Sequence, residues 1–242
     1  MASVPGQCNL SNLGTTNKQV FGVDGNGNFN LQNLRLIRSE VYQRYESLCK
    51  GALYADPLKV FIKQEPHKRK KLLDGRLRLI MSVSLIDAIV DRVLFMKLMH
   101  KVVRNYARTH IMIGWSPAKG GYRFLNSIFQ GMETLSIDKK AWDWTVPIWL
   151  LDAVRDVIFK LAADAPDWWR RAVEGRFQML FRRASFSFSD GSTVVQGKPG
   201  VMKSGCYLTI FINSIAQLIL HEMASAKLNI VADPIVVIGD DT

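Results

Sequence analysis

The alternation of long amphipathic helices with short strands is the sequence feature that most limits how this chain can fold. Apolar residues recur at intervals of three and four in the segments that predict long helices: 31–50, 85–106 and 208–226. Pro147 is suited to the start of a further helix that runs to about Leu161. Short β-branched or alternating runs predict strands at 60–62, 134–137 and 235–238. This order of elements indicates an α+β fold.

Carboxylates follow two of the predicted strands. Asp138 comes directly after 134–137, and Gly239-Asp240-Asp241 follows 235–238, where the pattern predicts a hairpin tip. A lone Gly-Asp-Asp is a weak signal, because a solvated turn has the same composition. Two neighbouring strands of one sheet would bring Asp138 and Asp240 together, where they repel unless they share cations. Carboxylates are the ligands Mg²⁺ prefers, and paired Mg²⁺ ions support in-line displacement at phosphorus.

A cationic segment spans residues 63–78. It holds seven Lys and Arg residues against Glu65 and Asp74: Lys63, Lys68, Arg69, Lys70, Lys71, Arg76 and Arg78. Gly75 divides it into two basic arms, which favours a hairpin over a helix. The alternative is a solvated basic loop. Beside a two-metal site, such donors would instead bind a triphosphate and stabilise its leaving group.

The net charge points to the same class of partner. The chain has 242 residues, with 32 Lys and Arg against 21 Asp and Glu, and a formal charge of +11. Such a balance indicates nucleic acid, nucleotides or an anionic membrane as the partner. The three cysteines form no C-x-x-C pair, and no Walker A loop or complete H-E-x-x-H is present, which argues against those metal and nucleotide sites. The most apolar stretch, 207–223, is too polar for a spanning helix, so no transmembrane segment is expected.

A polar stripe marks the start of the last predicted helix. Gly205 permits the turn from loop to helix after Ser204, and Thr209 and Asn213 lie four residues apart on one helix face. Two interpretations remain open. These groups are either satisfied within the core or they present hydroxyl and amide groups to a sugar.

Taken in order, these elements resemble motifs of viral RNA-dependent RNA polymerases. Asp138-x-x-x-x-Asp143, the Ser204–Asn213 pattern and Gly239-Asp240-Asp241 resemble motifs A, B and C of the palm. The runs at 63–68 and 76–80 look like motif F of the fingers. Within that class, the sequence is most similar to the sobemovirus and luteovirus group, over roughly residues 55–242. Three runs carry this similarity: Phe61-Ile62-Lys63-Gln64-Glu65-Pro66-His67-Lys68, Arg78-Leu79-Ile80-Met81-Ser82-Val83-Ser84 and Trp142-Asp143-Trp144.

The resemblance implies an architecture. We expect a right-hand polymerase palm with an antiparallel sheet plus fingers elements. The implied divisions are an N-terminal extension at 1–54, fingers with the basic hairpin and a helix at 55–132, and palm motifs at 133–242 with a fingers insertion around 165–200. Because the sequence given stops one residue after Asp241, we expect it to be truncated after motif C, to lack the thumb, and to be inactive without a C-terminal part.

The resemblance also implies roles for residues. Asp138, Asp240 and Asp241 would be catalytic and bind two Mg²⁺ ions, with Mn²⁺ as a substitute. Asp143 and Asn213 would bind the ribose 2′-hydroxyl, supported by Ser204, Gly205 and Thr209. Arg78 would hold the triphosphate, with Lys63, Lys68 and Arg76 along the nucleotide channel, and Glu65 would pair with a neighbouring base. One departure is the pair Lys139-Lys140 between the motif A aspartates.

The implied function is template-directed RNA synthesis in viral replication and transcription. The partners would be an RNA template, nascent RNA, ribonucleoside triphosphates and other viral replication proteins. The implied location is the host cytoplasm, in membrane-associated replication complexes. Two other interpretations stay open: a non-catalytic basic RNA-binding module, with Phe186-Ser187-Phe188 as its candidate aromatic surface, and an interaction-only fragment that keeps the fold.

Overall fold

The computed structural model describes residues 10–66 and 68–242, so His67 of the motif F-like run lies outside the described residues. Its helices are α1 (Asn17–Val20), α2 (Leu31–Cys49), α3 (Arg69–Leu73), α4 (Leu85–Arg104), α5 (Gly121–Ile128), α6 (Trp142–Thr145), α7 (Ile148–Leu161), α8 (Asp167–Phe181) and α9 (Thr209–Leu228). Short 3-10 turns lie at Ser11–Leu13, Tyr106–Arg108 and Ala118–Gly120. The strands are β1 (Leu58–Ile62), β2 (Leu79–Ser82), β3 (Ser185–Ser187) and β4 (Thr193–Val195).

The long helices lie where the apolar periodicity predicts them, and side chains cap their starts. Asn30 precedes α2, and its side chain accepts hydrogen bonds from the backbone of Gln32 and Asn33. Ser84 precedes α4 and accepts from the backbone of Asp87. Pro147 immediately precedes α7. The predictions for α2, α4, α7 and α9 are therefore confirmed.

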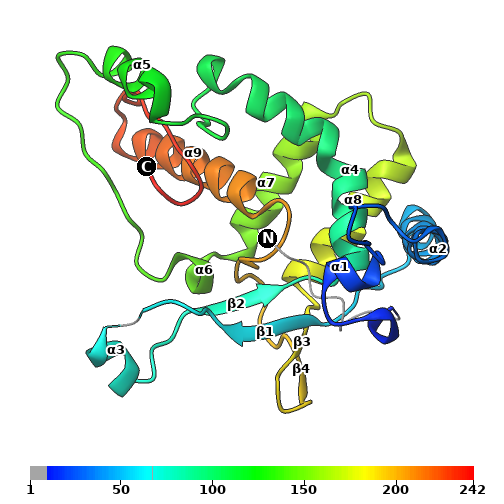
Figure 1. The fold of residues 1–242 in the computed structure, drawn as a ribbon. Helices are drawn as coiled ribbons and strands as arrows, with labels where there is room; N and C mark the ends of the chain where they lie inside the picture. Colours follow the sequence, from blue (N-terminus) through cyan, green and yellow to red (C-terminus); the bar gives the residue numbers. More distant parts are fainter. Residues whose placement is uncertain (1–9, 67) are drawn as a thin grey trace.

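The four strands form one mixed sheet in the order β2-β1-β3-β4. β1 and β2 pair antiparallel, so the basic segment is a hairpin, as predicted, whose connection contains the short helix α3. β1 also pairs in parallel with β3, and β3 pairs antiparallel with β4. Figure 1 shows the basic hairpin extending from one end of the helical part, with α3 at its far end.

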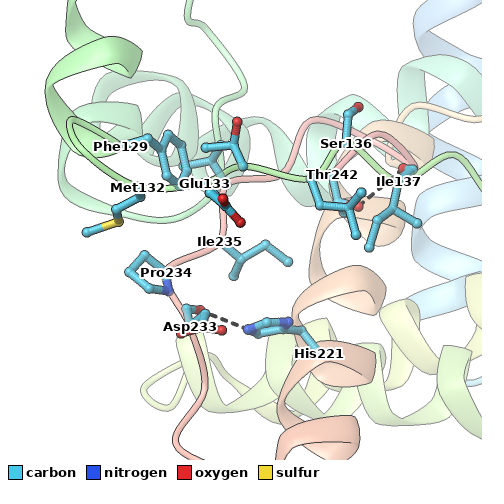
Figure 2. A pocket seen from close by; sticks show the side chains of 13 residues that line it. Phe129, Met132, Glu133, Ser136, Ile137, His221, Asp233, Pro234, Ile235 and Thr242 are labelled. Carbon is cyan, nitrogen blue, oxygen red and sulfur yellow. Dashed lines mark hydrogen bonds between the residues drawn. The ribbon is translucent and has the colours of Figure 1, made fainter.

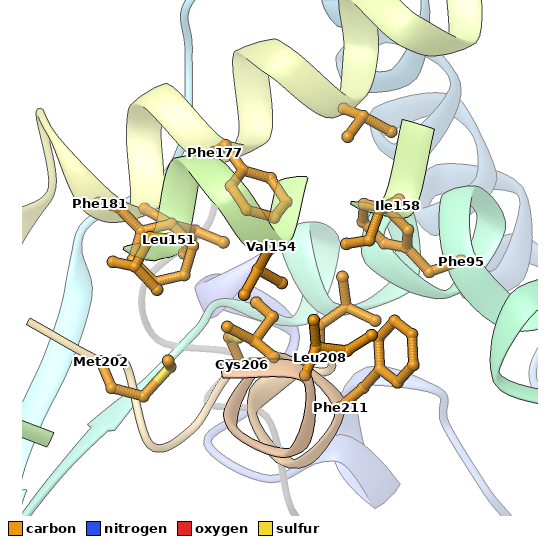
Figure 3. Packing of buried hydrophobic residues seen from close by; sticks show 14 of the residues in the cluster. Phe95, Leu151, Val154, Ile158, Phe177, Phe181, Met202, Cys206, Leu208 and Phe211 are labelled. Carbon is orange, nitrogen blue, oxygen red and sulfur yellow. The ribbon is translucent and has the colours of Figure 1, made fainter. Parts of the chain in front are cut away.

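The core lies between α4, α7, α8 and α9. Figure 3 shows its packing, in which Phe95 of α4, Val154 and Ile158 of α7, Phe177 of α8 and Phe211 of α9 gather around one centre. Each such buried side chain stabilises the fold by about 1.5–3 kcal/mol relative to exposure. Met202 and Cys206 belong to the same cluster. The loop that precedes α9 is therefore attached to the core rather than free at the surface.

Two strand predictions are wrong in their extent. Residues 132–139 contain no regular strand, and 235–238 contributes single bridges, Val237 with Ile111 and Ile238 with Asp241. A strand needs paired backbone groups over successive residues, and here single residues pair. The antiparallel palm sheet is thus absent from the described residues, whose one four-stranded sheet belongs to the basic hairpin and the 185–195 segment.

Two helices of eight or more residues were not predicted, α5 and α8, and neither were the short helices α1, α3 and α6. The apolar positions of α8 do recur with a helical period, but Trp168-Trp169, Arg170-Arg171 and the buried Arg176 obscure that pattern in the sequence. Among the residues that the structure describes, no helix combines the length and the apolar character that a membrane crossing requires.

Candidate active site

The Gly239-Asp240 segment is a tight turn fixed to α9. The backbone N–H of Ile238 donates to the carbonyl of Asp241 (3.0 Å), and Gly239 has a φ of 72°, which glycine adopts readily. The buried N–H of Gly239 donates to Ser214 Oγ at 2.9 Å. Asp240 at the tip is half-buried, and Asp241 is exposed. The predicted turn is therefore confirmed, and α9 holds its position.

The segment that carries Asp138 lies against this turn. The N–H of Ile137 donates to the carbonyl of Thr242 (2.8 Å), and Thr242 Oγ1 donates to the carbonyl of Ile137 (3.2 Å). The residue before Asp138 thus pairs with the residue after Asp241. Asp138 is exposed beside this junction.

Figure 2 shows the Ile137–Thr242 junction at one side of a cavity of about 610 Å³. The cavity lies between 129–137 and 233–236. His221 of α9 contacts the carbonyl of Asp233 through Nε2 at 2.9 Å, so it holds the approach to the Gly-Asp-Asp turn against the helix.

Lys139 lies in the electric field of two of the predicted metal-binding carboxylates. Partial burial lowers the pKa of Lys139 below its usual value, while the charges of Asp240 and Asp138 act in the opposite direction. Its ammonium therefore offsets some of the repulsion between these aspartates.

Asp143 lies one turn further along, in α6. Ala141 precedes this helix in the left-handed conformation (φ 54°), which reverses the chain between the two motif A aspartates. Burial raises the pKa of Asp143, the charge of Asp240 raises it further, and the charge of Arg78 lowers it. Asp143, Asp240 and Arg78 are thus close enough to interact electrostatically, although they come from three separate segments.

The polar stripe at the start of α9 lines a cleft of about 530 Å³ that also reaches Asp240. Ser204, Gly205, Thr209 and Asn213 all contribute to its wall. Thr209 Oγ1 also donates to the carbonyl of Lys203 (2.7 Å), and Asn213 Oδ1 accepts from Trp142 Nε1 (2.9 Å). Thr209 and Asn213 are thus bonded within the fold, as the first interpretation expects, and contact with a sugar in the cleft stays a prediction.

Sequence reasoning missed two residues at the mouth of this cleft. Arg92 of α4 lies over the ring of Tyr207, with its guanidinium carbon 5.2 Å from the ring centroid. The spacing of the two residues gives no sign of this pair, because α4 and the loop before α9 meet only in the folded chain.

The basic hairpin forms two separate groups of ion pairs. Glu65 forms ion pairs with Lys63 (2.7 Å) and with Arg78 (3.3 Å), so it pairs with neighbouring basic side chains, as predicted. Arg76 pairs with Asp74, and Lys68 is exposed just before α3. Arg78, the residue predicted to hold the triphosphate, also acts electrostatically on Asp143.

The donor chemistry of the aspartates fits magnesium. Asp138, Asp240 and Asp241 supply carboxylate oxygens, and Mg²⁺ is commonly bound by one or two carboxylates together with waters and substrate phosphates. Within residues 10–66 and 68–242, no group of three His, Cys, Asp or Glu side chains converges tightly enough to hold a metal ion by itself. The three aspartates therefore have the donor chemistry that magnesium takes, and their role as its ligands stays a prediction.

Comparisons with known proteins place the chain in a family. The chain is 33% identical over 211 residues to "Protein P2-P3" of Poinsettia latent virus, which covers 81% of this chain and 18% of that protein. It is 33% identical over 184 residues to "Replicase polyprotein P2AB" of Cocksfoot mottle virus, covering 74% of this chain and 19% of that one. It is 32% identical over 193 residues to "Protein P1-P2" of Potato leafroll virus, covering 70% and 17%. The chain therefore spans less than one fifth of these relatives.

A solved structure shares the fold. The Sicinivirus 3Dpol RNA-dependent RNA polymerase superposes with a TM-score of 0.71 at 20% identity, over all of this chain and 48% of that one. The resemblance to sobemovirus and luteovirus proteins is confirmed by the relatives above. The model of the viral RNA-dependent RNA polymerase family matches residues 39–241, so this chain belongs to that family.

Proposed function

We propose that this chain forms the catalytic centre of an enzyme that synthesises RNA on an RNA template by two-metal nucleotidyl transfer. The observation that carries the proposal is the pairing of Ile137 with Thr242, which sets Asp138 beside the Asp240-Asp241 turn. Membership of the polymerase family supports the reaction class.

The three aspartates would hold two Mg²⁺ ions, with Mn²⁺ as a substitute. When bound, the ions would lower the pKa of the attacking 3′-hydroxyl and offset the charge on the leaving pyrophosphate. The chain's own contribution is to hold Asp240 on a turn anchored by Ser214 and to keep the Lys139 ammonium within the electric field of Asp138 and Asp240.

The substrate would be a ribonucleoside triphosphate. Asp143 is half-buried and lies within the electric field of Asp240, which lines the cleft together with Asn213 and Ser204. Its carboxylate can accept a hydrogen bond from a ribose 2′-hydroxyl. Arg78 reaches toward the same place and can bind two phosphate oxygens at once if it exchanges its pairing with Glu65 for the substrate.

The partners and setting follow from the same proposal. The substrate strands would be an RNA template and nascent RNA, attracted by the net charge of +11. We place the reaction in the host cytoplasm, in membrane-associated complexes with other viral replication proteins.

The test is incorporation of ribonucleotides by the polymerase that contains this chain. Asp240→Asn should lower the rate at least about 100-fold, because a neutral amide is a poor ligand for Mg²⁺ and metal charge contributes several kcal/mol to this step. Asp164→Asn makes the same chemical change at an exposed position between α7 and α8 and should leave the rate unchanged. Equal rates for the two variants would refute the proposal.

The runner-up is a non-catalytic RNA-binding module, and one observation weakens it. Such a module stacks bases on exposed aromatic rings of a sheet. Phe186, on β3, is half-buried and instead packs against the ammonium of Lys203, 5.6 Å from the ring centroid. The other candidate, Phe188, is exposed beside the turn at 190–191 and bonds there through its backbone.

A further inference from the structure

Lys203 is a buried cation that the proposed chemistry does not use. Its side chain is fully buried in the loop before α9. Its Nζ donates to the carbonyls of Val201 (2.8 Å) and Gly200 (3.2 Å), and the rings of Phe181 and Phe186 lie 5.7 and 5.6 Å away. No carboxylate among the described residues forms an ion pair with it. A buried charge without a counter-ion is unfavourable, so its presence calls for a role that a smaller apolar residue could not fill.

The two carbonyls that Lys203 binds flank a strained turn. Val201 has a φ of 61°, in the left-handed region where a β-branched side chain clashes with its own backbone. Gly200 precedes it at a φ of 107°, and a Cβ there would lie 2.6 Å from the carbonyl of Val146. A strained conformation persists only where neighbouring contacts hold it. The Lys203 ammonium supplies two of these contacts.

The strained turn holds the site residues in place from both sides. On one side, Val201 N–H donates to the carbonyl of Val146 (3.2 Å) and Met202 N–H to the carbonyl of Asp143 (2.7 Å). On the other side, Gly205 N–H donates to the carbonyl of Met81 in β2 (3.0 Å). The loop thereby connects the backbone of Asp143 to the strand that leads from Arg78, with Ser204 in the cleft between them.

We propose that Lys203 is a positioning residue for ribose selection, which holds the left-handed turn at Val201 and, through Met202, fixes the backbone of Asp143. This inference rests on the proposed function, because it takes Asp143 as the group that reads the ribose. Lys203 acts at a distance, since its ammonium is sealed among Phe181, Phe186 and the loop's own carbonyls.

The experiment compares Lys203→Met with Lys198→Met in the polymerase that contains this chain. Methionine keeps most of the volume of lysine in the core and removes the two hydrogen bonds. Lys198 is exposed in the same loop, so its replacement removes the same charge without touching the turn. Two quantities are measured, the hydrogen exchange rate of the Met202 amide and the ratio of incorporation efficiencies for a ribonucleotide and its 2′-deoxy analogue.

Lys203→Met should raise the hydrogen exchange rate of the Met202 amide and lower the ratio of incorporation efficiencies, ribonucleotide over 2′-deoxy analogue. We expect a change of roughly tenfold in each, because hydrogen bonds of ordinary strength are lost. Lys198→Met should change neither. Adding Val201→Asn to Lys203→Met should restore both quantities toward wild type, because asparagine adopts the left-handed conformation more readily than valine. Unchanged exchange in Lys203→Met, or an equal effect of Lys198→Met, would overturn the proposal.

Two further outcomes separate this inference from the proposed function. A wild-type polymerase that incorporates no ribonucleotide would refute the function, while the exchange rates would still decide whether Lys203 holds the turn. If Lys203→Met does not fold, Val201→Asn alone decides the matter. It should slow exchange at Met202 by relieving the strain, and unchanged exchange would contradict the inference.

Discussion

Asp143 is the residue whose surroundings most directly suggest substrate choice. It is half-buried, and burial together with Asp240 raises its pKa. Asp143→Ala in the active polymerase should mainly weaken discrimination between ribose and deoxyribose. The lost hydrogen bond should reduce selectivity by about 1–3 kcal/mol. Incorporation efficiencies of a ribonucleotide and its 2′-deoxy analogue measure the change, and an unaltered ratio would remove Asp143 from this role.

The buried Lys203 should make the stability of the folded chain depend on pH. Burial lowers its pKa from 10.5 to about 7, with the neighbouring Cys206 thiol acting in the opposite direction. The folded chain therefore binds fewer protons than the unfolded chain between those two values, and the lysine's unfavourable contribution fades as the pH rises. The free energy of unfolding of wild type, relative to Lys203→Met, should rise by up to several kcal/mol from pH 6.5 to 9.5.

Denaturant unfolding at the two pH values measures this difference. Lys198→Met, which removes an exposed lysine, should run parallel to wild type. If the free energy of unfolding of Lys203→Met changes with pH as much as that of wild type, Lys203 keeps an ordinary pKa in the folded chain.

For single residues, the sequence predicts which side chains belong to the candidate site better than it predicts their contacts. The motif resemblance predicts Asp143, Asn213 and Asp240 as site residues, and in the structure Asn213 and Asp240 line one cleft while Asp143 lies within the electric field of Asp240. The bond from Trp142 to Asn213 and the burial of Lys203 could not be predicted. Each depends on residues about twenty or more positions away in sequence that only the folded chain brings close.

The helices α2, α4 and α8 are joined by a buried network of charges. Arg176 of α8 pairs with Asp91 of α4 (2.7 Å), and Asp87 of α4 lies between Arg176 (3.4 Å) and Arg44 of α2 (2.5 Å). Arg44 also pairs with Asp56, just before β1 (3.0 Å). These side chains are almost fully buried, so the network fixes how the helices meet rather than responding to solvent.

Removing one member of this network should be costly. Arg176→Ala leaves Asp91 buried without its ion-pair partner and leaves Asp87 with Arg44 alone, and we expect a loss of about 3–5 kcal/mol of stability. Arg182→Ala, at the end of the same helix, breaks a partly exposed pair with Asp152 and should cost about 1 kcal/mol or less. Urea unfolding of both variants measures the contrast. Similar losses would mean that Arg176 contributes no more than a surface ion pair.

Two residues of the basic hairpin, Arg78 and Lys70, should differ in their effects on nucleotide incorporation and template affinity. Arg78 lies on the strand side, where its charge acts on Asp143, whereas Lys70 lies in α3 and is exposed. Arg78→Ala should impair nucleotide incorporation far more than template affinity, because a guanidinium can bind two phosphate oxygens at once. Lys70→Ala should affect mainly template affinity. Single-turnover incorporation and RNA binding at one salt concentration test both, and equal catalytic losses would make the hairpin a general RNA clamp.

Elements with strong apolar periodicity were predictable, and those defined by long-range pairing were not. The helices α4 and α9 follow from spacing alone. The parallel pairing of β1 with β3 has no local signal, since it joins segments more than a hundred residues apart. The segments before Asp138 and Asp240 have strand-like composition, but composition does not supply the backbone partners that a sheet requires.

For the molecule as a whole, the excess of positive charge predicts salt-dependent RNA binding. Arg69, Lys70 and Lys71 are exposed on α3 at the far end of the hairpin. Replacing all three with alanine should reduce the slope of log affinity against log salt by about 2, since each phosphate contact to a single strand contributes about 0.7. Titrations of single-stranded RNA across a range of salt concentrations measure the slope. An unchanged slope would place the RNA path elsewhere.

The parallel pairing of β1 with β3 also has a consequence for how the chain is made. Leu58 lies opposite Phe186, so the ribosome adds 128 residues (186 minus 58) after one partner emerges before the other exists. At ordinary rates of translation this takes roughly 6–25 s, far longer than a hairpin needs to form. During that interval the β1–β2 hairpin has an open edge at Leu58 and Lys59, on the strand that also carries the exposed side chains of Phe61 and Ile62. Chains that stop before β3 would keep that edge open and would therefore tend to associate with one another.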